Sequence, residues 1–529
     1  MKLTSSARMR EMDRHVIEDL GVPGVMLMAN AAEHVAAAAM ERLPIGGRAA
    51  VFCGAGNNGG DGTGAAAYLT EKGVFTRAFL VGNREKLTPD SKEMLRRLDA
   101  SGGKIESFGE ACGIEEYLDE CGVVIDAIFG IGLNSDLRGD ALMAVEMINR
   151  ARAYKIAADI PSGVSADTGA VLGGAVKADL TVTFSLPKPG HFVEPGCICT
   201  GELRVCDIGI PSDVTGGAAP NAFVVMPGDI TLPRRRPDTH KGDYGRCLIA
   251  AGSVGYTGAP VLSARAASRM GAGLVFLGVP EAIYSVIAAK CDEEMPFPLP
   301  DDGHGRLAVS AADEIMRRAG ECDAVLIGPG LSRSPGITEL VRSVVKSASA
   351  PVILDADGIY AIAGNIDILD EAACPLILTP HAGEFARLGG DLSSGDRLCA
   401  ARDFAQRHGC VLVLKGHRTI TALPDGAAYI NTTGGPAMAK GGSGDVLAGM
   451  ILALVGQGFP IKDAVLAAVY IHGLSGDLCA AEYGEYSVTA GDLISFLPKA
   501  IKRLTVEQPT ADRGRAFFAE SENFRTKDN

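Results

Sequence analysis

The chain has 529 residues, of which 47% are apolar and 22% are charged, a composition typical of globular proteins. At roughly 100–200 residues per domain, this length predicts two or three domains, each with a core of its own. With 50 basic and 64 acidic residues the formal net charge is −14, so no overall positive field attracts nucleic acid or an anionic membrane. Any phosphorylated ligand must therefore be bound by local backbone amides and a few cations.

Several features predict a soluble protein of the cytoplasm. The segment Met1–Arg14 is charged and lacks the apolar stretch of a signal peptide. The most apolar stretch, Val446–Gly456, is far shorter than the roughly 20 residues that a membrane span needs. The thirteen cysteines include no C-x-x-C pair, and no zinc-like spacing follows the nearest two, Cys197 and Cys199. We therefore expect reduced, mostly buried thiols.

Residues 1–217 predict an α/β domain. Two helices are expected within Met9–Leu43, where apolar residues recur at helical spacing and Pro44 ends the second helix. Short, continuously apolar runs follow, alternating with helical segments. The expected strands are Ala49–Cys53, Ala78–Val81, Val123–Phe129, Ile156–Ala158 and Leu180–Phe184. Continuous apolar runs are typical of strands buried on both faces, which predicts a parallel sheet between helices in a Rossmann-like, three-layer fold.

The amino-acid composition changes in residues 218–236, which we expect to be a linker. Prolines are frequent there, a basic run occupies Arg234–Arg236, and one short strand is expected at Phe223–Met226. A second α/β domain is predicted over 237–502, followed by a polar tail at 503–529. The expected elements of the second domain are the strands Cys247–Ala251, Leu274–Val279, Ala324–Ile327, Val352–Leu354, Leu376–Leu378 and Val411–Leu414 and the final helices Val446–Val455 and Lys462–Glu482.

A glycine-rich loop follows the first strand of the first domain. Gly54, Gly56 and Gly59 match the pattern G-x-G-x-x-G, in which the backbone approaches a pyrophosphate at a helix N-terminus. A dehydrogenase would also place an acid at the end of the next strand, but that strand ends Val81-Gly-Asn-Arg84. The loop therefore indicates nucleotide binding and disfavours a dehydrogenase.

Acids and a serine follow two more strands of this domain. Asp126 and Asp159 each end a strand, and Ser162 comes shortly after the second. Because ligands bind at the carboxyl ends of parallel strands, we expect these residues to converge with Asn58. Each acid alone is equally compatible with a helix cap or an Asx-turn. Amide, carboxylate and hydroxyl oxygens are hard ligands, suited to an alkali or alkaline-earth cation rather than zinc.

The strongest pattern of the second half is Gly441-Gly-Ser-Gly-Asp445, which opens an apolar helix. Its backbone amides predict an anion hole supported by the helix dipole. Asp445 is placed to take a proton from a substrate hydroxyl while the hole stabilises a transferring phosphoryl group. The alternative is that Asp445 is only an N-cap residue.

Other loops of the second half supply supporting groups. One strand is followed by His381 and Glu384, and Glu384 could organise Mg²⁺ around phosphates. Another is followed by the cationic loop Lys415–Thr419, which suits a nucleotide phosphate but could also be an ordinary solvated turn. Glycine turns that end at Ala259 and Gly330 would let a ligand approach the main chain.

Together these motifs resemble the family of bifunctional NAD(P)H-hydrate repair enzymes, in which an epimerase domain precedes an ADP-dependent dehydratase domain of ribokinase-like fold. The resemblance covers residues 1–502. It rests on Met9–Asp13, Gly54–Asp61, Asp126–Gly132, Asp159–Gly163, His240–Gly245, Tyr256–Pro260, Gly328–Leu331, Thr379–Glu384 and Gly441–Asp445. Both sets of motifs occur in one chain and in the family's order, which makes the resemblance specific.

The resemblance also implies roles for individual residues. In the epimerase domain it implies that the hydrated nucleotide is bound by Asn57, Asn58, Gly59, Gly60, Asp61, Gly130, Ile131, Gly132, Leu133, Asn134, Ser135 and Asp136, with Asp159 at the reacting ring. It implies K⁺ bound by Asn58, Asp126 and Ser162. In the dehydratase domain it implies contacts to the hydrate from Ala259, Gly330, His381 and Asp445, and to the adenine nucleotide from Lys415, Gly416, His417, Arg418, Thr419 and Gly444.

The activity implied is repair of NADH or NADPH to which water has added, leaving a hydroxyl at C6 of the ring. The first domain would interconvert the R and S forms, with Asp159 as acid and base. The second would phosphorylate the S hydroxyl with ADP and Mg²⁺, and elimination would give NAD(P)H, AMP and phosphate. ADP rather than ATP follows the family's bacterial pattern. We expect no nucleic-acid or membrane partner and expect a homo-oligomer.

Two alternatives remain at this point. The second half could be a sugar or vitamin kinase, although sugar kinases of this fold usually carry Asn where His381 stands. The first half could be a nucleotide-binding module without catalysis. Ser443 and Gly435, where the family commonly has Thr and Asn, look harmless for the anion hole.

Overall fold

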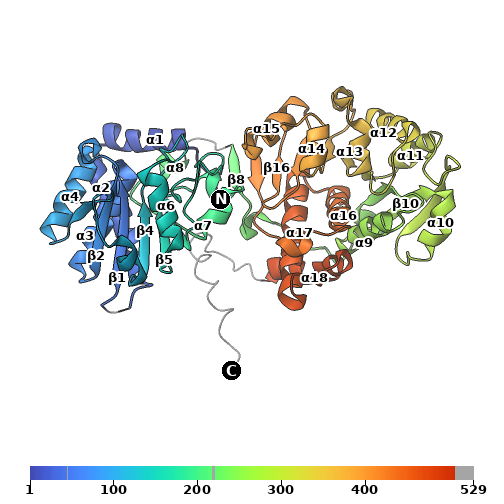
Figure 1. Ribbon diagram of the computed structural model, residues 1–529. Helices are drawn as coiled ribbons and strands as arrows, with labels where there is room; N and C mark the ends of the chain where they lie inside the picture. Colours follow the sequence, from blue (N-terminus) through green and yellow to red (C-terminus); the bar gives the residue numbers. More distant parts are fainter. Residues whose placement is uncertain (45, 217–220, 507–529) are drawn as a thin grey trace. The chain divides into compact units, whose positions relative to one another are not determined.

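The computed structural model describes residues 1–44, 46–216 and 221–506 and divides the chain into two compact units (Figure 1). Among the described residues, one unit comprises residues within 2–222, and the other comprises Met1 and residues 223–506. The expected domain and linker limits remain predictions. Within the expected linker, a short strand, β8 (Ala222–Val224), lies near the one predicted there. The expected tail from 503 begins inside the last helix, and its part beyond 506 lies outside the described residues.

The first unit contains a seven-stranded sheet of order β3-β2-β1-β4-β5-β6-β7, in which every neighbouring pair is parallel. Its strands are β1 (Arg48–Gly54), β2 (Phe75–Val81), β3 (Ile105–Ser107), β4 (Val123–Ala127), β5 (Tyr154–Ala158), β6 (Leu180–Phe184) and β7 (Glu202–Cys206). Its helices are α1 (Ser6–Arg14), the π-helical turn His15–Asp19, α2 (Gly24–Met40), α3 (Asn57–Glu71), α4 (Pro89–Ala100), α5 (Ile114–Asp119), α6 (Asp140–Arg150), α7 (Gly196–Thr200) and α8 (Ser212–Gly216).

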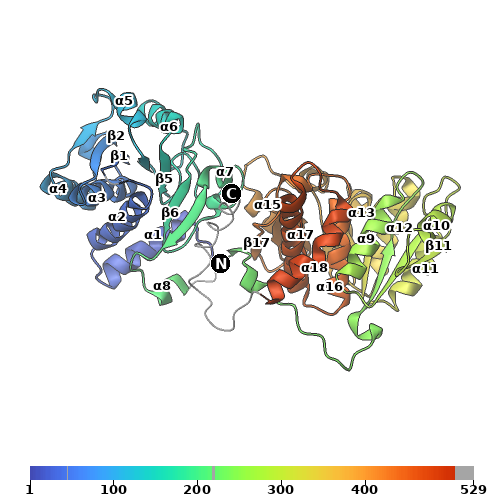
Figure 2. The ribbon, with the colours of Figure 1, turned by 90° about the horizontal axis from the view of Figure 1, so that it is seen from below.

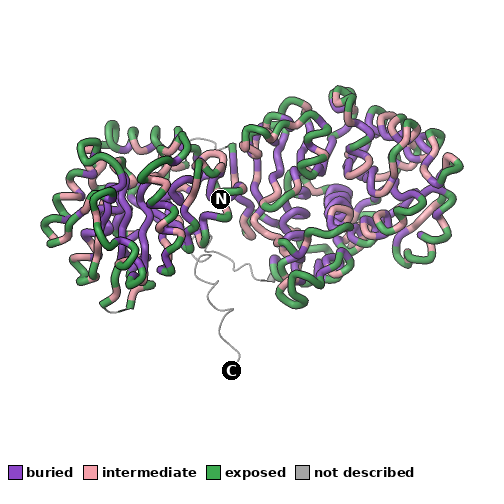
Figure 3. Tube along the Cα trace, in the orientation of Figure 1, coloured by how far each residue is buried: buried purple, intermediate pink, exposed green. Residues whose placement is uncertain are grey.

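Both faces of this sheet are buried, as the apolar runs predict. In β1, Ala49 and Val51 pack in one core with α2 and α3, whereas Ala50 and Phe52 pack in another with α5 and α6. The tube in Figure 3 shows the strands buried between more exposed helices. The three-layer α/β fold expected for this half is therefore confirmed.

The second unit contains a ten-stranded sheet of order β11-β10-β9-β12-β13-β14-β15-β16-β17-β8. The pairs from β11 to β15 are parallel, and β15, β16 and β17 are antiparallel. Its further strands are β9 (Arg246–Ala250), β10 (Leu274–Pro280), β11 (Met295–Leu299), β12 (Ala324–Ile327), β13 (Val352–Leu354), β14 (Leu376–Leu378), β15 (Val411–Leu414), β16 (Ile420–Ala422) and β17 (Ala428–Ile430).

Helices enclose this second sheet. They are α9 (Gly258–Arg269), α10 (Glu281–Ala288), α11 (Ala311–Ala319), α12 (Pro335–Ser347), α13 (Asp357–Ile362), α14 (Ala382–Arg387), α15 (Arg397–Arg407), α16 (Ser443–Gly456), α17 (Ile461–Tyr483) and α18 (Ala490–Val506). The helices α9, α16, α17 and α18 pack against one another and bury one large core with β9 and β10 (Figure 2). The helices α11, α12 and α13 form a second packed group.

Among the described residues, one helix, α17, is long and apolar enough to cross a membrane by length and composition. It is longer than the apolar stretch at 446–456 that stands out in the sequence. Because 72% of its most apolar window is buried inside the domain, it has the character of a core helix. All thirteen cysteines are free thiols and most are buried, as expected.

The order of each sheet reverses beside its first strand. In the first unit β1 lies between β2 and β4, and in the second β9 lies between β10 and β12. The connections leaving the two central strands of each sheet run to opposite sides there, which opens a crevice at their carboxyl ends. The glycine-rich loops predicted from the sequence follow β1, β4, β9 and β12, so the fold delivers them to these two crevices.

Candidate active sites

A cavity of about 700 Å³ opens at the carboxyl edge of the first sheet. Its walls come from α1, α2 and the loops that follow β1, β2, β4 and β5. The predicted residues that line it are Asn57, Asn58, Asp61, Gly130, Ile131, Gly132, Leu133 and Asp159. The other predicted residues, Gly59, Gly60, Asn134, Ser135 and Asp136, do not line it.

Gly59 has a structural reason to be glycine. A Cβ built there would meet the Gly54 carbonyl oxygen at 1.7 Å, so the turn from β1 into α3 closes only without a side chain. The loop therefore brings Asn57, Asn58 and Asp61 to the cavity while the glycine packs behind them. This is the close approach of backbone to backbone that such loops require.

Asp159 is the most constrained residue of this cavity. Its φ of +65° lies in the left-handed region that non-glycine residues seldom adopt. Its Oδ1 accepts hydrogen bonds from Lys188 Nζ at 2.5 Å and from Thr183 Oγ1 at 3.0 Å. The His191 Nε2 donates to the Asp159 carbonyl oxygen at 2.8 Å, and its Nδ1 accepts from the Lys188 amide. The surrounding bonds hold a strained turn in place, as is typical of functional sites.

The pair is buried and ionised. The Lys188 side chain is only 1% exposed. Burial alone raises the pKa of Asp159, but the charge of Lys188 and its hydrogen bond outweigh burial and leave that pKa below its ordinary value. Burial lowers the pKa of His191 to about 4, so its ring is neutral at pH 7 and donates from Nε2. The site therefore holds a carboxylate whose proton affinity is set by one buried ammonium.

Sequence reasoning missed Lys188 and Asp13. Lys188 lies between two prolines after β6, and only its position near a strand end marked it in advance. Asp13 is on α1, and its side chain reaches the same cavity. Burial raises the pKa of Asp13 to about 6 and that of Asp61 well above its ordinary value. The cavity thus combines one ionised carboxylate with two carboxyl groups that hold protons more tightly.

The residues expected to bind a cation lie together. Ser162 Oγ donates to Asp126 Oδ1 at 2.6 Å and accepts from the Phe129 amide at 2.8 Å. The Asn58 amide is buried, with neither polar atom hydrogen-bonded, and its Oδ1 would lie 3.0 Å from a Cβ at Gly130. An orphaned amide oxygen beside a carboxylate and a hydroxyl fits a weakly bound alkali cation. Burial raises the pKa of Asp126 to about 6, a cost that a cation would offset.

In the second unit, α16 begins at the glycine-rich motif. Gly442, the N-cap residue of α16, has φ +97°, in the left-handed region that favours glycine. Ser263 Oγ of α9 donates to the Asp445 carbonyl oxygen at 3.0 Å and fixes this first turn. Burial, followed by the charge of Asp355, raises the pKa of Asp445 to about 7. A carboxylate with a pKa near neutrality suits a general base.

Lys415 points into this site. Its Nζ lies 2.8 Å from Asp355 Oδ1, and Thr379 Oγ1 donates to the same oxygen at 2.6 Å. A Cβ built at Gly444 would lie 3.4 Å from Lys415 Nζ, which places the ammonium at the opening of α16. Burial alone lowers the pKa of Lys415, but Asp355 and Glu384 raise it above its ordinary value. Asp355 therefore holds the lysine in place.

The remaining predicted residues flank this centre. Gly330, with φ +65°, lies against Ala259, since a Cβ at Gly330 would be 3.3 Å from the Ala259 Cβ. The loop Lys415–Thr419 is a tight hairpin between β15 and β16, in which Arg418 donates to the Thr432 carbonyl oxygen at 2.7 Å. Its role in nucleotide binding stays a prediction. Within the loop, Thr419 Oγ1 donates to the Gly416 carbonyl oxygen at 3.1 Å, and a Cβ at Gly416 would lie 2.7 Å from Arg397 Nη2.

Glu384 is engaged in contacts within the protein. Its Oε2 accepts from the His381 amide at 2.9 Å, and it lies 3.9 Å from Lys415 Nζ. The His381 ring in turn caps α14 through Nδ1. Within the described ranges, no group of three or more His, Cys, Asp or Glu side chains is placed to hold a metal. Mg²⁺ at Glu384 therefore stays a prediction, since one carboxylate together with nucleotide phosphates is enough to hold this ion.

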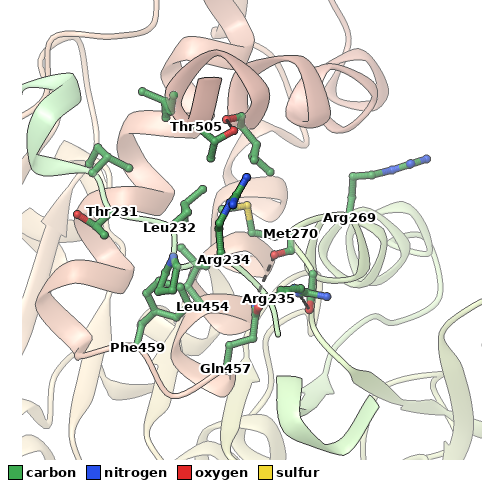
Figure 4. Close-up of a pocket in the computed structure, with 15 residues that line it drawn as sticks. Thr231, Leu232, Arg234, Arg235, Arg269, Met270, Leu454, Gln457, Phe459 and Thr505 are labelled. Atoms are coloured by element: carbon green, nitrogen blue, oxygen red, sulfur yellow. Dashed lines mark hydrogen bonds between the residues drawn. The ribbon is translucent and has the colours of Figure 1, made fainter. Parts of the chain in front are cut away.

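A second cavity of the second unit, of about 590 Å³, lies away from these groups. It is lined by the segment Ile230–Arg235 and by the C-terminal ends of α9, α16 and α18. Arg235 donates to the Gly271 carbonyl oxygen and to Gln457, so it ties two helix ends together (Figure 4). In the same view Arg269 extends away from the other labelled residues. We find a structural role for Arg235 and no catalytic group in this cavity.

Comparison with known proteins agrees with this division. Residues 24–190 match the family model described as YjeF-related protein N-terminus, and residues 247–499 match the model described as NAD(P)H-hydrate dehydratase. The chain is 40% identical to a bifunctional NAD(P)H-hydrate repair enzyme of Moorella thermoacetica, over 96% of this chain and 98% of that one. A protein of the same name from Thermofilum pendens is also 40% identical, over 95% and 97% of the two chains.

Among solved structures, an ADP/ATP-dependent NAD(P)H-hydrate dehydratase of Bacillus subtilis, co-crystallised with ATP and Mg²⁺, is 34% identical. The match covers 54% of this chain and all of that one, with a TM-score of 0.47. The sequence motifs predict an epimerase domain followed by a dehydratase domain. The two family models match the chain in that order. On the identity and coverage of its relatives, this chain belongs to the family of bifunctional NAD(P)H-hydrate repair enzymes.

Proposed function

We propose that the chain repairs hydrated NADH and NADPH with two active sites, an epimerase in the Rossmann-like first domain and a nucleotide-dependent dehydratase in the ribokinase-like second domain. One observation carries the proposal: each crevice at a sheet reversal holds one carboxyl group with the proton affinity that its step requires. These are Asp159, paired with Lys188 in the first domain, and Asp445 at the opening of α16 in the second.

In the first domain, the cavity of about 700 Å³ is large enough for the nicotinamide end of a dinucleotide. Asn57, Asn58 and Gly130–Leu133 would hold the nucleotide beside the N-terminus of α3, where backbone amides stabilise phosphate. Asp159 would then face the C6 hydroxyl, take its proton and return one when the opposite configuration forms. The ammonium of Lys188 keeps Asp159 ionised for the first of these steps.

Asn58, Asp126 and Ser162 would hold K⁺. The buried, unbonded amide of Asn58 supports this assignment, because such a group is costly without a partner. A bound K⁺ supplies fixed positive charge that orders the loops after β1, β4 and β5. Phe129, whose amide bonds Ser162, connects that site to the cavity wall at Gly130.

In the second domain, Asp445 would take the proton of the S hydroxyl as its oxygen attacks the terminal phosphoryl group of the nucleotide. The amides at the start of α16 and the Lys415 ammonium would stabilise the charge on that group. Cleavage of the C6–O bond then releases phosphate, and loss of a proton from C5 restores the ring double bond. Ala259, Gly330 and His381 would contact the hydrate.

ADP is the proposed phosphoryl donor, with AMP as its product. Mg²⁺ would accompany the nucleotide phosphates rather than sit in a preformed carboxylate cage, in keeping with the engaged state of Glu384. Lys415, Gly416, His417, Arg418, Thr419 and Gly444 are the proposed nucleotide contacts. Because every cysteine is a free thiol, we also propose a reducing, cytoplasmic setting, and homo-oligomerisation stays a prediction.

The two half-reactions can be tested separately with the whole chain. Purified R-hydrate of NADH, incubated without nucleotide, should yield the S form on chromatography faster than in buffer. Purified S-hydrate with Mg²⁺ and ADP or ATP should regain dihydronicotinamide absorbance. If the R form stays unchanged, the first domain is a binding module only. If a stable phosphate ester accumulates from the S form, the second domain is a kinase.

A further inference from the structure

The epimerase cavity contains more carboxyl groups than the reaction above uses. Asp13 and Asp61 line it together with Asp159 and Lys188. We propose that Asp13 and Asp61, the acid pair of this cavity, supply the general acid of epimerisation, and that Asp159 with Lys188 forms the base. This inference deepens the proposed function and rests on its epimerase half.

The isolation of the two carboxyl groups is the first support. Asp61 is 9% exposed, and within the described ranges neither its side chain nor that of Asp13 forms a hydrogen bond or an ion pair. A carboxyl group that is nine-tenths buried without a partner is costly, so it is usually retained for a ligand or a proton-transfer step. Both side chains face the cavity into which the hydrated ring would enter.

The contrast with Asp159 is the second support. Lys188 lowers the pKa of Asp159, whereas burial raises the pKa of Asp61 and that of Asp13, the latter to about 6; the charge of Asp159 adds to this at both sites and the charge of Lys188 opposes it. Carboxyl groups that line one cavity disfavour each other's ionisation, so a proton is retained more readily at sites without a cationic partner. When the environments of two groups in one site push their pKa values apart, one group usually acts as the acid and the other as the base.

The other charged groups at the cavity do not replace this pair. The ionisable residues that line it are Arg10, Asp13, Lys86, Asp61, Asp90, Asp159 and Lys188. Arg10 and Lys86 are exposed, and Arg10 donates to the Ile131 carbonyl oxygen. Asp90 lies near the start of α2, close to Gly24. His191 lies behind Asp159 as a neutral ring whose two nitrogens are both hydrogen-bonded.

The substrate chemistry requires both an acid and a base. A hydroxyl on C6, which is bonded to the ring nitrogen N1, forms a carbinolamine. Asp159 removes the hydroxyl proton while the acid pair places a proton on N1, and the C6–N1 bond breaks to leave an aldehyde at C6. Rotation about C5–C6 presents the other face. N1 then attacks C6, its proton returns to the acid pair, and Asp159 returns a proton to the oxygen, so atoms and charge balance.

Within the pair, Asp13 would exchange protons with solvent. It is half-buried on α1 at the wall of the cavity, whereas Asp61 lies deeper at the start of α3. The arrangement predicts that the epimerisation rate falls as pH rises and the acid pair loses its proton. This fall in rate at alkaline pH is the alkaline limb of the pH profile. A purely structural role for these carboxyl groups would not produce it.

The test compares wild type with Asp13→Asn and Asp61→Asn in the full chain. Epimerisation of purified R-hydrate is followed by chromatography from pH 5 to 9. Each variant should lose about 100-fold or more in kcat, the range typical of a missing general acid, with KM changed only a few-fold. The alkaline limb of wild type should disappear from both profiles, and Asp13→Glu should restore part of the rate together with the limb.

Two controls separate the possible failures. Asp99→Asn, on the exposed surface of α4, should leave the epimerase profile unchanged, and the dehydratase rate of each preparation reports an intact chain. If Asp61→Asn does not fold, Asp13→Asn alone decides. Unchanged kcat and an unchanged alkaline limb in that variant overturn the inference. An inactive wild type would instead refute the epimerase function on which the inference rests.

Discussion

The ammonium of Lys188 lies 2.5 Å from Oδ1 of Asp159, and both side chains are almost fully removed from solvent. Thr183 bonds both partners, and His191 bonds the Asp159 backbone and the Lys188 amide. Because the lysine sets the charge of the carboxylate, the pair behaves as one functional unit. Loss of either partner should therefore affect both the stability of the first domain and its chemistry.

Replacing Lys188 with Met should destabilise the first domain by about 3–5 kcal/mol, because a buried carboxylate is left unpaired. The pKa of Asp159 should rise, and epimerisation should fall by at least 100-fold at neutral pH. Thermal unfolding and the R-to-S conversion rate measure the two effects.

The double variant Lys188→Met with Asp159→Asn provides the control for that prediction. It removes the unpaired negative charge of Asp159, so much of the stability of the first domain should return while epimerisation stays absent. Equal stability of the single and double variants would show that the ion pair is not what holds this turn.

K⁺ should stabilise the first domain and support epimerisation in preference to Na⁺ or choline at equal ionic strength. The affinity should weaken as pH falls through about 6, because protonation of Asp126 competes with the cation. Asp126→Asn should remove most of the K⁺-dependent rise in melting temperature. A response that is the same for all three cations would contradict the site.

Asp445→Asn should abolish dehydration of the S-hydrate, by about 100-fold or more, and leave epimerisation intact. The reason is that an amide cannot take the hydroxyl proton. In wild type, the dehydration rate should rise with pH through about 7 as Asp445 ionises. Near-normal dehydration by this variant would assign the base to another residue.

The same substitution should stabilise the second domain at alkaline pH. The folded pKa of Asp445, about 7, exceeds its ordinary value, so the native state binds more protons and loses stability as pH rises from about 4 to about 7. Asp445→Asn should therefore melt higher than wild type at pH 8, by an amount that disappears near pH 4. Asp403→Asn, on the surface of α15, should show no such crossover.

Gly444→Ala should weaken the nucleotide without disturbing the fold. The added methyl group would stand 3.4 Å from Lys415 Nζ and 4.0 Å from Asp355 Oδ2, so it fits, but it occupies the space proposed for phosphate. KM for the nucleotide should rise about tenfold or more, with an unchanged melting temperature. Gly491→Ala, in α18 with no close neighbour, should leave KM unchanged. An unchanged KM in Gly444→Ala would place the phosphate elsewhere.

The sequence predicts the central strands well because they are apolar on both faces and short. It overextends one of them: β4 ends at Ala127 rather than Phe129, because Asp126 Oδ1 accepts from the Ile128 amide and turns the chain. It also misses edge strands such as β11, which contains two prolines and is partly exposed. Local apolarity cannot identify a strand that is stabilised mainly by one neighbour.

Site prediction shows a similar limit. Glycine loops and strand-end acids mark Asp126, Asp159 and Asp445 because their spacing along the chain fixes their place at the sheet edge. Lys188 and Asp13 carry no such signal. They reach the cavity through a proline-bounded loop and an N-terminal helix, and only the packed structure brings them to Asp159. For Glu384 the structure shows a contact with the His381 amide at the start of α14, which the motif does not predict.

The most direct test of the account supplies the full chain with racemic NADH hydrate, Mg²⁺, K⁺ and either ADP or ATP, and follows dihydronicotinamide absorbance. Both active sites in one chain predict complete recovery, faster than spontaneous epimerisation allows, with Asp159→Asn halting after the S half is consumed. A wild-type reaction that stops at half recovery would contradict the epimerase, and no recovery with either nucleotide would contradict the dehydratase.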